Sequence, residues 1–160
     1  MTNYIYFWKP QENNGFLGNW YNSPFIKDGI RFINNEQYFM WGKQQLFNPT
    51  NILLEKSILE TPNPSEIRKL GRCVKNFNQT VWDTNKYEIM KTGLIEKFLQ
   101  NTELKKALID TNDAILVEAS PYDTIWGIGL CEKDAKTKKW RGDNLLGKAL
   151  MDVRTILNSK

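Results

Sequence analysis

The sequence predicts a mainly helical α+β fold: one compact multihelical domain over residues 1–160, with a few short β-strands including an N-terminal hairpin. The length favours one domain, because two domains of this total size would each be unusually small. Hydrophobic residues make up 41% and charged residues 25%, which is typical of globular proteins. After residue 35, apolar positions recur mainly at the helical spacings of three and four.

A few segments have the composition of β-strands. Residues 4–8 predict a strand near the N-terminus, and residues 25–33 predict a hairpin. Asp28-Gly29 lies at the centre of that hairpin and supplies the positive backbone angles of a tight turn. Residues 114–119, which read Ala-Ile-Leu-Val-Glu-Ala, predict a buried strand.

The predicted helices begin at residues that favour helix N-termini. They are 36–47 capped by Asn35, 65–70 from Ser65 to a stop at Gly71, a longer helix capped by Thr84, 102–108 from Thr102, and a final helix capped by Asn144. The apolar stripe of the longer helix contains Tyr87, Met90, Leu94 and Phe98. The final helix turns Leu146, Leu150, Val153 and Leu157 toward the core.

The composition excludes several kinds of active site. The chain has no histidine, which removes the Ser-His-Asp triad, the Cys-His dyad and His-containing zinc sites. Its cysteines, Cys73 and Cys131, are too few and too far apart for a disulfide scaffold or a four-cysteine metal site. Any chemistry must therefore use Asp, Glu, Lys, Tyr, Cys or a cofactor, and our expectation is that neither a metal nor a redox cofactor is used.

The location of the protein is expected to be cytoplasmic. No apolar run approaches the roughly 18 to 20 residues that cross a bilayer, so no membrane partner is expected. The first ten residues lack the basic start and the apolar core of a secretory signal.

The net charge of +4 is concentrated in one loop. Residues 133–141 contain Lys133, Lys136, Lys138, Lys139 and Arg141 against the single acid Asp134. Such a basic loop suits a phosphate or a nucleic-acid backbone. A plain solvated loop is the alternative interpretation.

Glu36 and Lys43 form the first candidate catalytic pair. Seven residues turn a helix by about 700°, so both side chains emerge from nearly the same face, about 10.5 Å apart along the axis. A substrate could lie between them. The bulky residues 38–41 indicate a largely buried helix, in which charges need partners or a function. A solvent-facing Glu and Lys pair is the alternative.

Residues 122–129 form the second candidate constellation, directly after the apolar segment 114–119. Gly127 and Gly129 would let a backbone approach a ligand closely. Trp126 offers a stacking face or a core side chain, and Trp82, placed in a loop before the long helix, has the same two interpretations. Asp123 begins the turn, as a catalytic group or as a cap.

These pieces together resemble the NADAR family, the YbiA-like N-glycosidases, over nearly the whole chain. The motifs that carry the resemblance are Phe16-Leu17-Gly18-Asn19-Trp20, Asn35-Glu36-Gln37-Tyr38-Phe39 with Lys43, Gly71-Arg72, Trp82, Lys97-Phe98, Leu116-Val117-Glu118-Ala119, Asp123 with Trp126-Gly127-Ile128-Gly129, and Trp140 to Gly147 followed by Met151 and Arg154. One difference is Gln37, where the family commonly has His.

The resemblance implies a compact, mainly helical enzyme that cleaves N-glycosidic bonds. It implies a small nucleotide-sugar, such as a ribosylated pyrimidine of riboflavin synthesis, or ADP-ribosyl-guanine in nucleic acid as the substrate. Glu36, Lys43 and Asp123 are then the catalytic candidates, with Lys43 able to form a Schiff base with an opened ribose. The substrate-binding candidates are Asn19, Arg72, Trp82, Trp126, Gly127, Gly129 and Asn144.

Two other function classes remain open from the sequence. One is a module that binds ADP-ribose or a nucleotide without cleaving it, which the replacement of the family His by Gln37 keeps open. The other is a small single-strand nucleic-acid binder that uses its tryptophans and the 133–141 loop. Release of free base separates the enzyme from both.

Overall fold

The computed structural model describes residues 1–159 and confirms the mainly helical fold with short strands. The elements, in chain order, are β1 (Tyr4–Phe7), the 3-10 turn η1 (Gly15–Leu17), β2 (Phe25–Lys27), β3 (Ile30–Phe32), α1 (Asn35–Phe47), α2 (Ile52–Glu60), α3 (Pro64–Gly71), α4 (Gln79–Gln100), α5 (Thr102–Ile109), β4 (Ile115–Glu118), α6 (Glu132–Ala135) and α7 (Leu145–Asn158). None of the helices within 1–159 has both the length and the apolar character of a membrane span.

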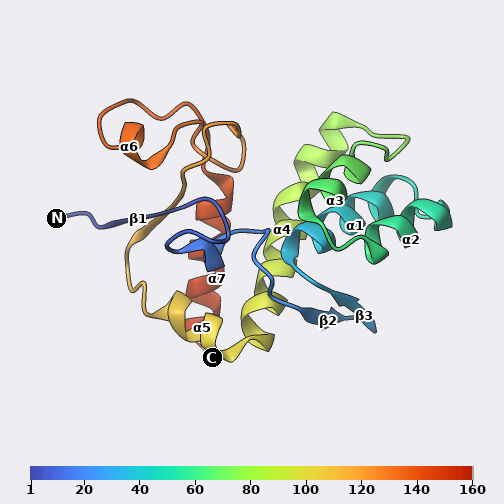
Figure 1. The fold of residues 1–160 in the computed structure, drawn as a ribbon, viewed down its shortest axis with the longest axis horizontal. Coiled ribbons are helices and arrows are strands. Elements are labelled where there is room, and N and C mark those ends of the chain that lie inside the picture. The colour runs from blue at the N-terminus through green and yellow to red at the C-terminus, as the bar shows by residue number, and fades with distance from the viewer. Residues whose placement is uncertain (160) are drawn as a thin grey trace.

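The long helix α4 lies at the centre of the molecule (Figure 1). Helices α1 to α3 and the β2–β3 hairpin lie on one side of it, and α7, β1 and α6 lie on the other. Helix α4 packs against both α1 and α7, and α7 in turn packs against β4. The main core therefore spans both sides of α4 through its buried apolar stripe, which includes Met90, Leu94 and Phe98.

The strands form two separate pairs. β2 and β3 pair antiparallel with Phe25 opposite Phe32, and Asp28 and Gly29 have φ angles of 52° and 79°, as the predicted hairpin turn requires. β1 pairs in parallel with β4, which places Phe7 opposite Glu118. This second pairing joins segments that are far apart in the sequence, with Tyr4 opposite Ile115, and could not be predicted from local patterns.

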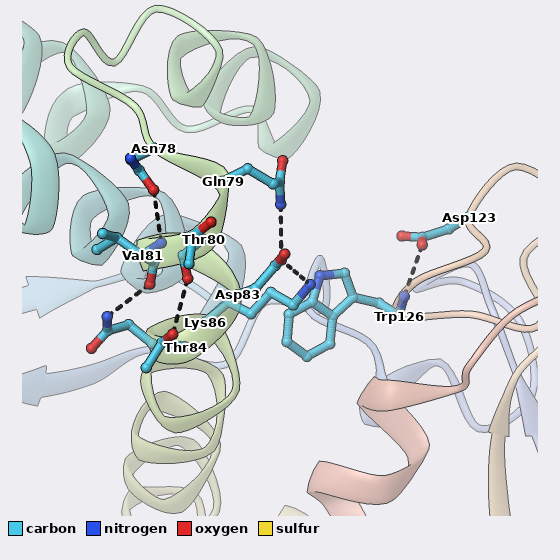
Figure 2. A network of polar contacts seen from close by, with 10 residues as sticks. Asn78, Gln79, Thr80, Val81, Asp83, Thr84, Lys86, Asp123 and Trp126 are labelled. Atoms are coloured by element: carbon cyan, nitrogen blue, oxygen red, sulfur yellow. Dashed lines mark hydrogen bonds and ion pairs between the residues drawn. The ribbon is translucent and has the colours of Figure 1, made fainter.

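Three predicted helix starts are wrong by one to six residues, because a neighbouring asparagine makes the cap. Asn34 accepts a hydrogen bond from the Gln37 N–H at 2.9 Å, so Asn35 already lies inside α1. Asn63 caps α3 in place of Ser65, and Asn78 caps α4 in place of Thr84. Figure 2 shows the Asn78 cap together with the bonds Gln79 to Asp83 and Thr84 to Thr80 that follow it.

The early start of α4 places Trp82 in its first turns and not in a loop. The sequence analysis also missed α2 and α6. Helix α2 buries only Leu54 and Ile58, too few positions for a visible periodicity, and Asn51 caps it by accepting the Leu54 N–H at 3.1 Å. Helix α6 is a single turn that begins at Glu132, one residue before the basic loop.

Glycine permits the close crossing of α1 and α4. Gly93 of α4 faces α1, where a Cβ would collide with the Asn35 side chain and approach the Tyr38 ring to 2.5 Å. The crossing brings the first turn of α1, with Glu36, against the middle of α4, where Met90 lies. The position of Glu36 thus depends on a tertiary contact.

Candidate active site

A cavity of about 860 Å³ lies between α1, α3, α4 and the segments around residues 8–11, 19–20 and 118–126. This volume suits a ligand larger than a simple sugar. The structure brings together seven predicted site residues in its lining: Asn19, Glu36, Lys43, Arg72, Trp82, Asp123 and Trp126. They come from segments that are distant in the sequence.

Glu36 projects into this cavity from the first turn of α1 and is 7% exposed. Its backbone N–H donates to the Asn19 carbonyl oxygen at 3.1 Å, which connects α1 to the 16–20 segment. Burial raises the pKa of the Glu36 carboxyl to about 7, and the charge of Asp123 adds to the rise. The positive charge of Arg68 and a hydrogen bond from the Trp20 side chain oppose it.

Glu118 supplies a second buried carboxyl that the sequence analysis did not include among the site residues. It ends β4 and lines the same cavity, and its Oε2 is buried without a hydrogen-bond partner among the described residues. Burial raises the pKa of Glu118 to about 8, and the charges of Asp123 and Glu36 add to this. An acid inside the apolar segment 114–119 was the signal that could have identified it.

Replacing Glu118 by Gln should flatten the pH dependence of stability. The pKa of Glu118 is raised above its usual 4.5 to about 8 in the folded protein, so folding favours the protonated form. The stability that depends on this proton is complete below about pH 4.5 and is lost as pH rises through about 8. We expect the free energy of unfolding to fall between pH 5 and pH 8 by at least about 1 kcal/mol more in the wild type than in Glu118→Gln.

Urea unfolding of both proteins at the two pH values measures this difference. Glu103→Gln, at an exposed position of α5, is the matched control and should behave as the wild type does. Parallel stability profiles for the wild type and Glu118→Gln would contradict the assignment of a buried, protonated Glu118.

Lys43 lies in an aromatic environment, two helical turns after Glu36 on α1. Its Nζ is 4.9 Å from the centre of the Phe77 ring and 5.8 Å from that of Trp82. Burial lowers the pKa of the Lys43 amine, and the positive charge of Arg72 lowers it further. Both effects favour the neutral amine, which is the nucleophilic form.

Two arginines of the α3 region line the cavity. Arg72 was predicted, and Arg68 was missed although the spacing of four places the two on neighbouring turns of one helix face. Arg68 acts electrostatically on both Glu36 and Glu118. Two guanidinium groups at the rim of a cavity suit the oxygen atoms of phosphate groups.

The aromatic wall of the cavity is part of the protein core. Phe39 packs against Trp82 with ring centres 5.1 Å apart, and Trp126 meets Phe39 edge-on at 5.2 Å. Trp82 is only 9% exposed. Both tryptophans therefore combine the two interpretations that the sequence left open, because they line the cavity and also pack in the core.

Three candidate site residues, Asp123, Gly127 and Gly129, stabilise the turn that follows β4. Asp123 lines the cavity, but its Oδ1 accepts the N–H groups of Ile125 and Trp126 at 2.9 and 2.8 Å, the second of which is visible in Figure 2. Gly127 and Gly129 lie outside the lining that the structure describes. A Cβ at Gly127 would lie 2.9 Å from the Asp123 carbonyl oxygen, and Gly129 has a φ of 71°, so backbone packing explains both glycines.

The structure also corrects the prediction for Asn144. Its side chain neither caps α7 nor reaches the described cavity lining. The amide oxygen accepts the Glu118 N–H at 3.0 Å, and the amide nitrogen donates to the Leu116 carbonyl oxygen at 2.9 Å. Asn144 thus anchors β4, the strand that presents Glu118.

Gln37, the difference from the family pattern, is a structural residue. Its side chain is 1% exposed, accepts the Ile33 N–H at 2.8 Å and donates to the carbonyl oxygens of Ile58 and Leu59. These bonds join α1 to β3 and α2. Because Gln37 faces away from the cavity lining, replacement of a His here leaves the carboxyls and the amine of the site in place.

Lys97 is a buried charge that holds the 16–20 segment. It projects from α4 and is fully buried, and its Nζ donates to the carbonyl oxygens of Phe16 at 2.7 Å and Gly18 at 2.9 Å. Burial lowers the pKa of this amine to about 7. Since Asn19 follows directly and accepts the Glu36 N–H, Lys97 supports the segment on which Glu36 rests.

Replacing Lys97 by Met should lower kcat by about tenfold, which corresponds to about 1.4 kcal/mol of barrier. The thioether fills similar space but cannot donate to the two carbonyl groups, so the segment with Asn19 and Trp20 loses its anchor. Lys91→Met, at a half-buried position of the same helix where the lysine pairs with Glu88, is the control. Steady-state kinetics with a melting curve for each variant tests this, and an unchanged kcat in Lys97→Met would contradict it.

The basic loop was expected to suit a phosphate, but the structure does not place it at this cavity. No described residue of the cavity lining comes from 133–141. Within the loop, Lys136 pairs with Glu132 at 3.6 Å and Lys138 pairs with Asp134 at 3.3 Å. Its positive charges are thus partly compensated at the surface.

Changing Lys138, Lys139 and Arg141 together to Gln should leave the KM for a ribosylated pyrimidine phosphate unchanged within about twofold. The reason is that these side chains lie outside the cavity lining. Steady-state kinetics at low ionic strength is the measurement. A rise in KM of about tenfold would show that the loop contributes to substrate binding.

Comparisons with known proteins support the family resemblance that the sequence motifs indicate. The NADAR domain matches residues 6–158. N-glycosidase R617 of Acanthamoeba polyphaga mimivirus is 44% identical over 126 residues, which are 77% of this chain and 73% of that protein. A riboflavin biosynthesis protein of Vibrio vulnificus is 33% identical over 153 residues, 96% of this chain but 38% of that protein.

A solved structure confirms the fold. The NMR structure of the E. coli protein YbiA has a TM-score of 0.80 and 27% sequence identity with this chain, and the match covers 99% of this chain and 88% of that one. The resemblance drawn from the motifs is therefore confirmed. The chain belongs to the NADAR family, and its enzyme class is that of the N-glycosidases.

Proposed function

We propose that the protein hydrolyses the N-glycosidic bond between a ribose and a base in a substrate that carries phosphate. The observation that carries this proposal is the pair of buried carboxyls, Glu36 and Glu118, in one cavity with the half-buried Lys43. Cleavage of such a bond needs a proton for the departing base and stabilisation of a positively charged sugar. Carboxyls with pKa values near neutrality serve both needs.

The two carboxyls divide these roles. Burial and the charges of Asp123 and Glu36 raise the pKa of Glu118, and its buried Oε2 has no hydrogen-bond partner among the described residues, so Glu118 donates a proton or a hydrogen bond to the departing base. Glu36 has the charge of Arg68 and the Trp20 hydrogen bond to favour its ionised form, which stabilises the positive charge that develops at the anomeric carbon. The charge of each makes ionisation of the other more costly, which favours one proton on the pair.

Lys43 provides a covalent route to the same products. Its neutral amine attacks the anomeric carbon and the bond to the base breaks, so that the base leaves with a proton. The bond between the anomeric carbon and the ring oxygen then breaks, the ring oxygen takes a proton from the amine nitrogen, and an imine forms between Lys43 and the opened ribose. Water then adds to the imine and releases the sugar, which restores the amine. The aromatic surroundings and Arg72 favour the neutral amine that this route requires.

Arg68 and Arg72 support a phosphate-bearing substrate, and the aromatic wall of Phe39, Trp82 and Trp126 supports a planar base. The riboflavin-related relative favours a ribosylated pyrimidine among the candidates. ADP-ribose on guanine is the second candidate, because the cavity volume of about 860 Å³ accommodates a ligand larger than a ribosyl pyrimidine.

The experiment offers the protein each substrate separately. One reaction contains ribosylated pyrimidine intermediates and the other contains single-stranded DNA with ADP-ribosylated guanine, and mass spectrometry follows release of the free base or of unmodified DNA. Release that is lost in Glu36→Gln supports the proposal and identifies the substrate. Binding of either compound without any release would contradict it and would favour the non-cleaving nucleotide-binding module.

A further inference from the structure

Asn35 is a fully buried polar side chain directly before the catalytic candidate Glu36. It does not cap α1, because Asn34 does, and it lies outside the described cavity lining. Its Oδ1 is buried and has no hydrogen-bond partner among the described residues. An unpaired buried polar atom lowers the stability of a folded protein, so packing alone does not favour an amide at this position.

The nitrogen end of the Asn35 amide makes two contacts toward the cavity. The Asn35 Nδ2 donates to the Asn19 Oδ1 at 2.9 Å and to the Met90 Sδ at 3.1 Å. The Asn19 Nδ2 donates to the same sulfur atom at 3.4 Å. Asn19 and Met90 both line the 860 Å³ cavity. Asn35 therefore supports, from outside the lining, two residues that a ligand can reach.

The surroundings favour one orientation of each amide. A thioether sulfur accepts hydrogen bonds but has no proton to donate, so Met90 suits the nitrogen ends of both amides and not their oxygen ends. The oxygen end of Asn35 lies against Gly93, where a Cβ would collide with it. If the Asn35 amide were reversed, two N–H groups without an acceptor would replace that one oxygen atom.

The orientation of Asn35 decides which group Asn19 offers to the cavity. Because the Asn19 Oδ1 accepts from Asn35, that oxygen is occupied by the protein. The Asn19 amide nitrogen carries two N–H bonds and has the Met90 sulfur as its acceptor among the described residues, so one N–H is available to a ligand. The main chain of Asn19 is also fixed, because its carbonyl oxygen accepts the Glu36 N–H at 3.1 Å.

We propose that Asn35 is a positioning residue for the reaction. It holds the Asn19 amide so that the NH2 group, and not the carbonyl oxygen, donates a hydrogen bond to an oxygen atom of the substrate in the cavity that contains Glu36. The kinetic consequence rests on the proposed function. The arrangement of the two amides in the free protein does not depend on it.

A double-mutant cycle separates positioning from general support of the fold. Asn35→Ala removes the donor to Asn19, and Asn19→Ala removes the amide that is positioned. We expect each change to lower kcat/KM for a ribosylated pyrimidine phosphate by about tenfold, and the double variant to stay within about twofold of either single variant. If Asn35 acted independently of Asn19, the two losses would multiply to about 100-fold.

Asn51→Ala is the matched control. It removes another asparagine that makes a hydrogen bond, the cap of α2 to the Leu54 N–H, at a half-buried position outside the described cavity lining. It should lower the melting temperature and leave kcat/KM unchanged within about twofold. If a melting curve shows that Asn35→Ala is unfolded, Asn35→Ser takes its place in the cycle, because the serine hydroxyl fills more of the space but is one bond shorter than the amide.

NMR of the free protein tests the arrangement without turnover. In the wild type, the side-chain N–H protons of Asn19 and Asn35 should both show nuclear Overhauser effects to the Met90 methyl group. The Asn19 signal should be lost in Asn35→Ala, because nothing then holds the Asn19 amide toward the sulfur, and it should persist in Asn51→Ala.

An unchanged Asn19 signal in Asn35→Ala would overturn the proposal, as would an unchanged kcat/KM in that variant or losses that multiply in the double variant. Failure of the proposed function gives a different result. In that case the wild type releases no base from any substrate, and the NMR signals still decide whether Asn35 orients Asn19.

Discussion

A Glu36→Gln variant should fold normally and lose at least about 100-fold in turnover, which corresponds to about 3 kcal/mol of barrier. Gln keeps the size of the side chain and can accept hydrogen bonds, but it cannot carry the negative charge that stabilises the sugar in the transition state. Glu36 is buried in the first turn of α1 with its pKa raised to about 7, and the two other carboxyls of the cavity come from the segment 118–123, so neither takes its place on α1.

Single-turnover release of free base, followed by mass spectrometry, measures the effect of Glu36→Gln. Glu88→Gln, which removes the same charge from an exposed position of α4, is the control and should retain full activity. A circular dichroism melt confirms that both variants are folded. Turnover of Glu36→Gln within about threefold of the wild type would exclude Glu36 as a catalytic residue.

Borohydride added during turnover should attach the sugar covalently to Lys43. If the imine forms, reduction converts it to a stable secondary amine, whereas direct attack of water on the sugar leaves no adduct. Lys43→Arg should abolish both the adduct and turnover, because guanidinium stays protonated and is not a nucleophile. Peptide mapping by mass spectrometry identifies the modified residue.

Lys91→Arg, on α4, is the matched control and should trap sugar and turn over as the wild type does. An active Lys43→Arg enzyme would contradict the covalent route. So would a wild type that releases base steadily and never traps sugar. In either case Lys43 would keep a binding role beside Phe77 and Trp82, and Glu36 with Glu118 would carry the reaction.

Much of the fold could be predicted because its signals are local. The Asp28-Gly29 turn, the apolar segment that became β4 and the stripe around Met90 each lie within a few residues, and the structure confirms all of them. The first residues of three helices were predicted wrongly, because several neighbouring residues can each cap a helix N-terminus. At Asn34, Asn63 and Asn78 the residue that caps is the one whose side-chain oxygen reaches a free N–H, and this depends on backbone geometry.

The sequence by itself determined that Glu36 and Lys43 share one face of a helix, because the angle between them follows from helix geometry alone. Only the tertiary structure decided which other groups join them. The parallel pairing of β1 with β4 and the crossing of α1 over α4 at Gly93 bring Glu118 into one cavity with Glu36. Backbone packing keeps Gly127 and Gly129 out of the cavity lining, and side-chain hydrogen bonds to β4 do the same for Asn144. The physical reason is that burial and the raised pKa of a carboxyl come from segments distant in the sequence, and no local pattern specifies which segments those are.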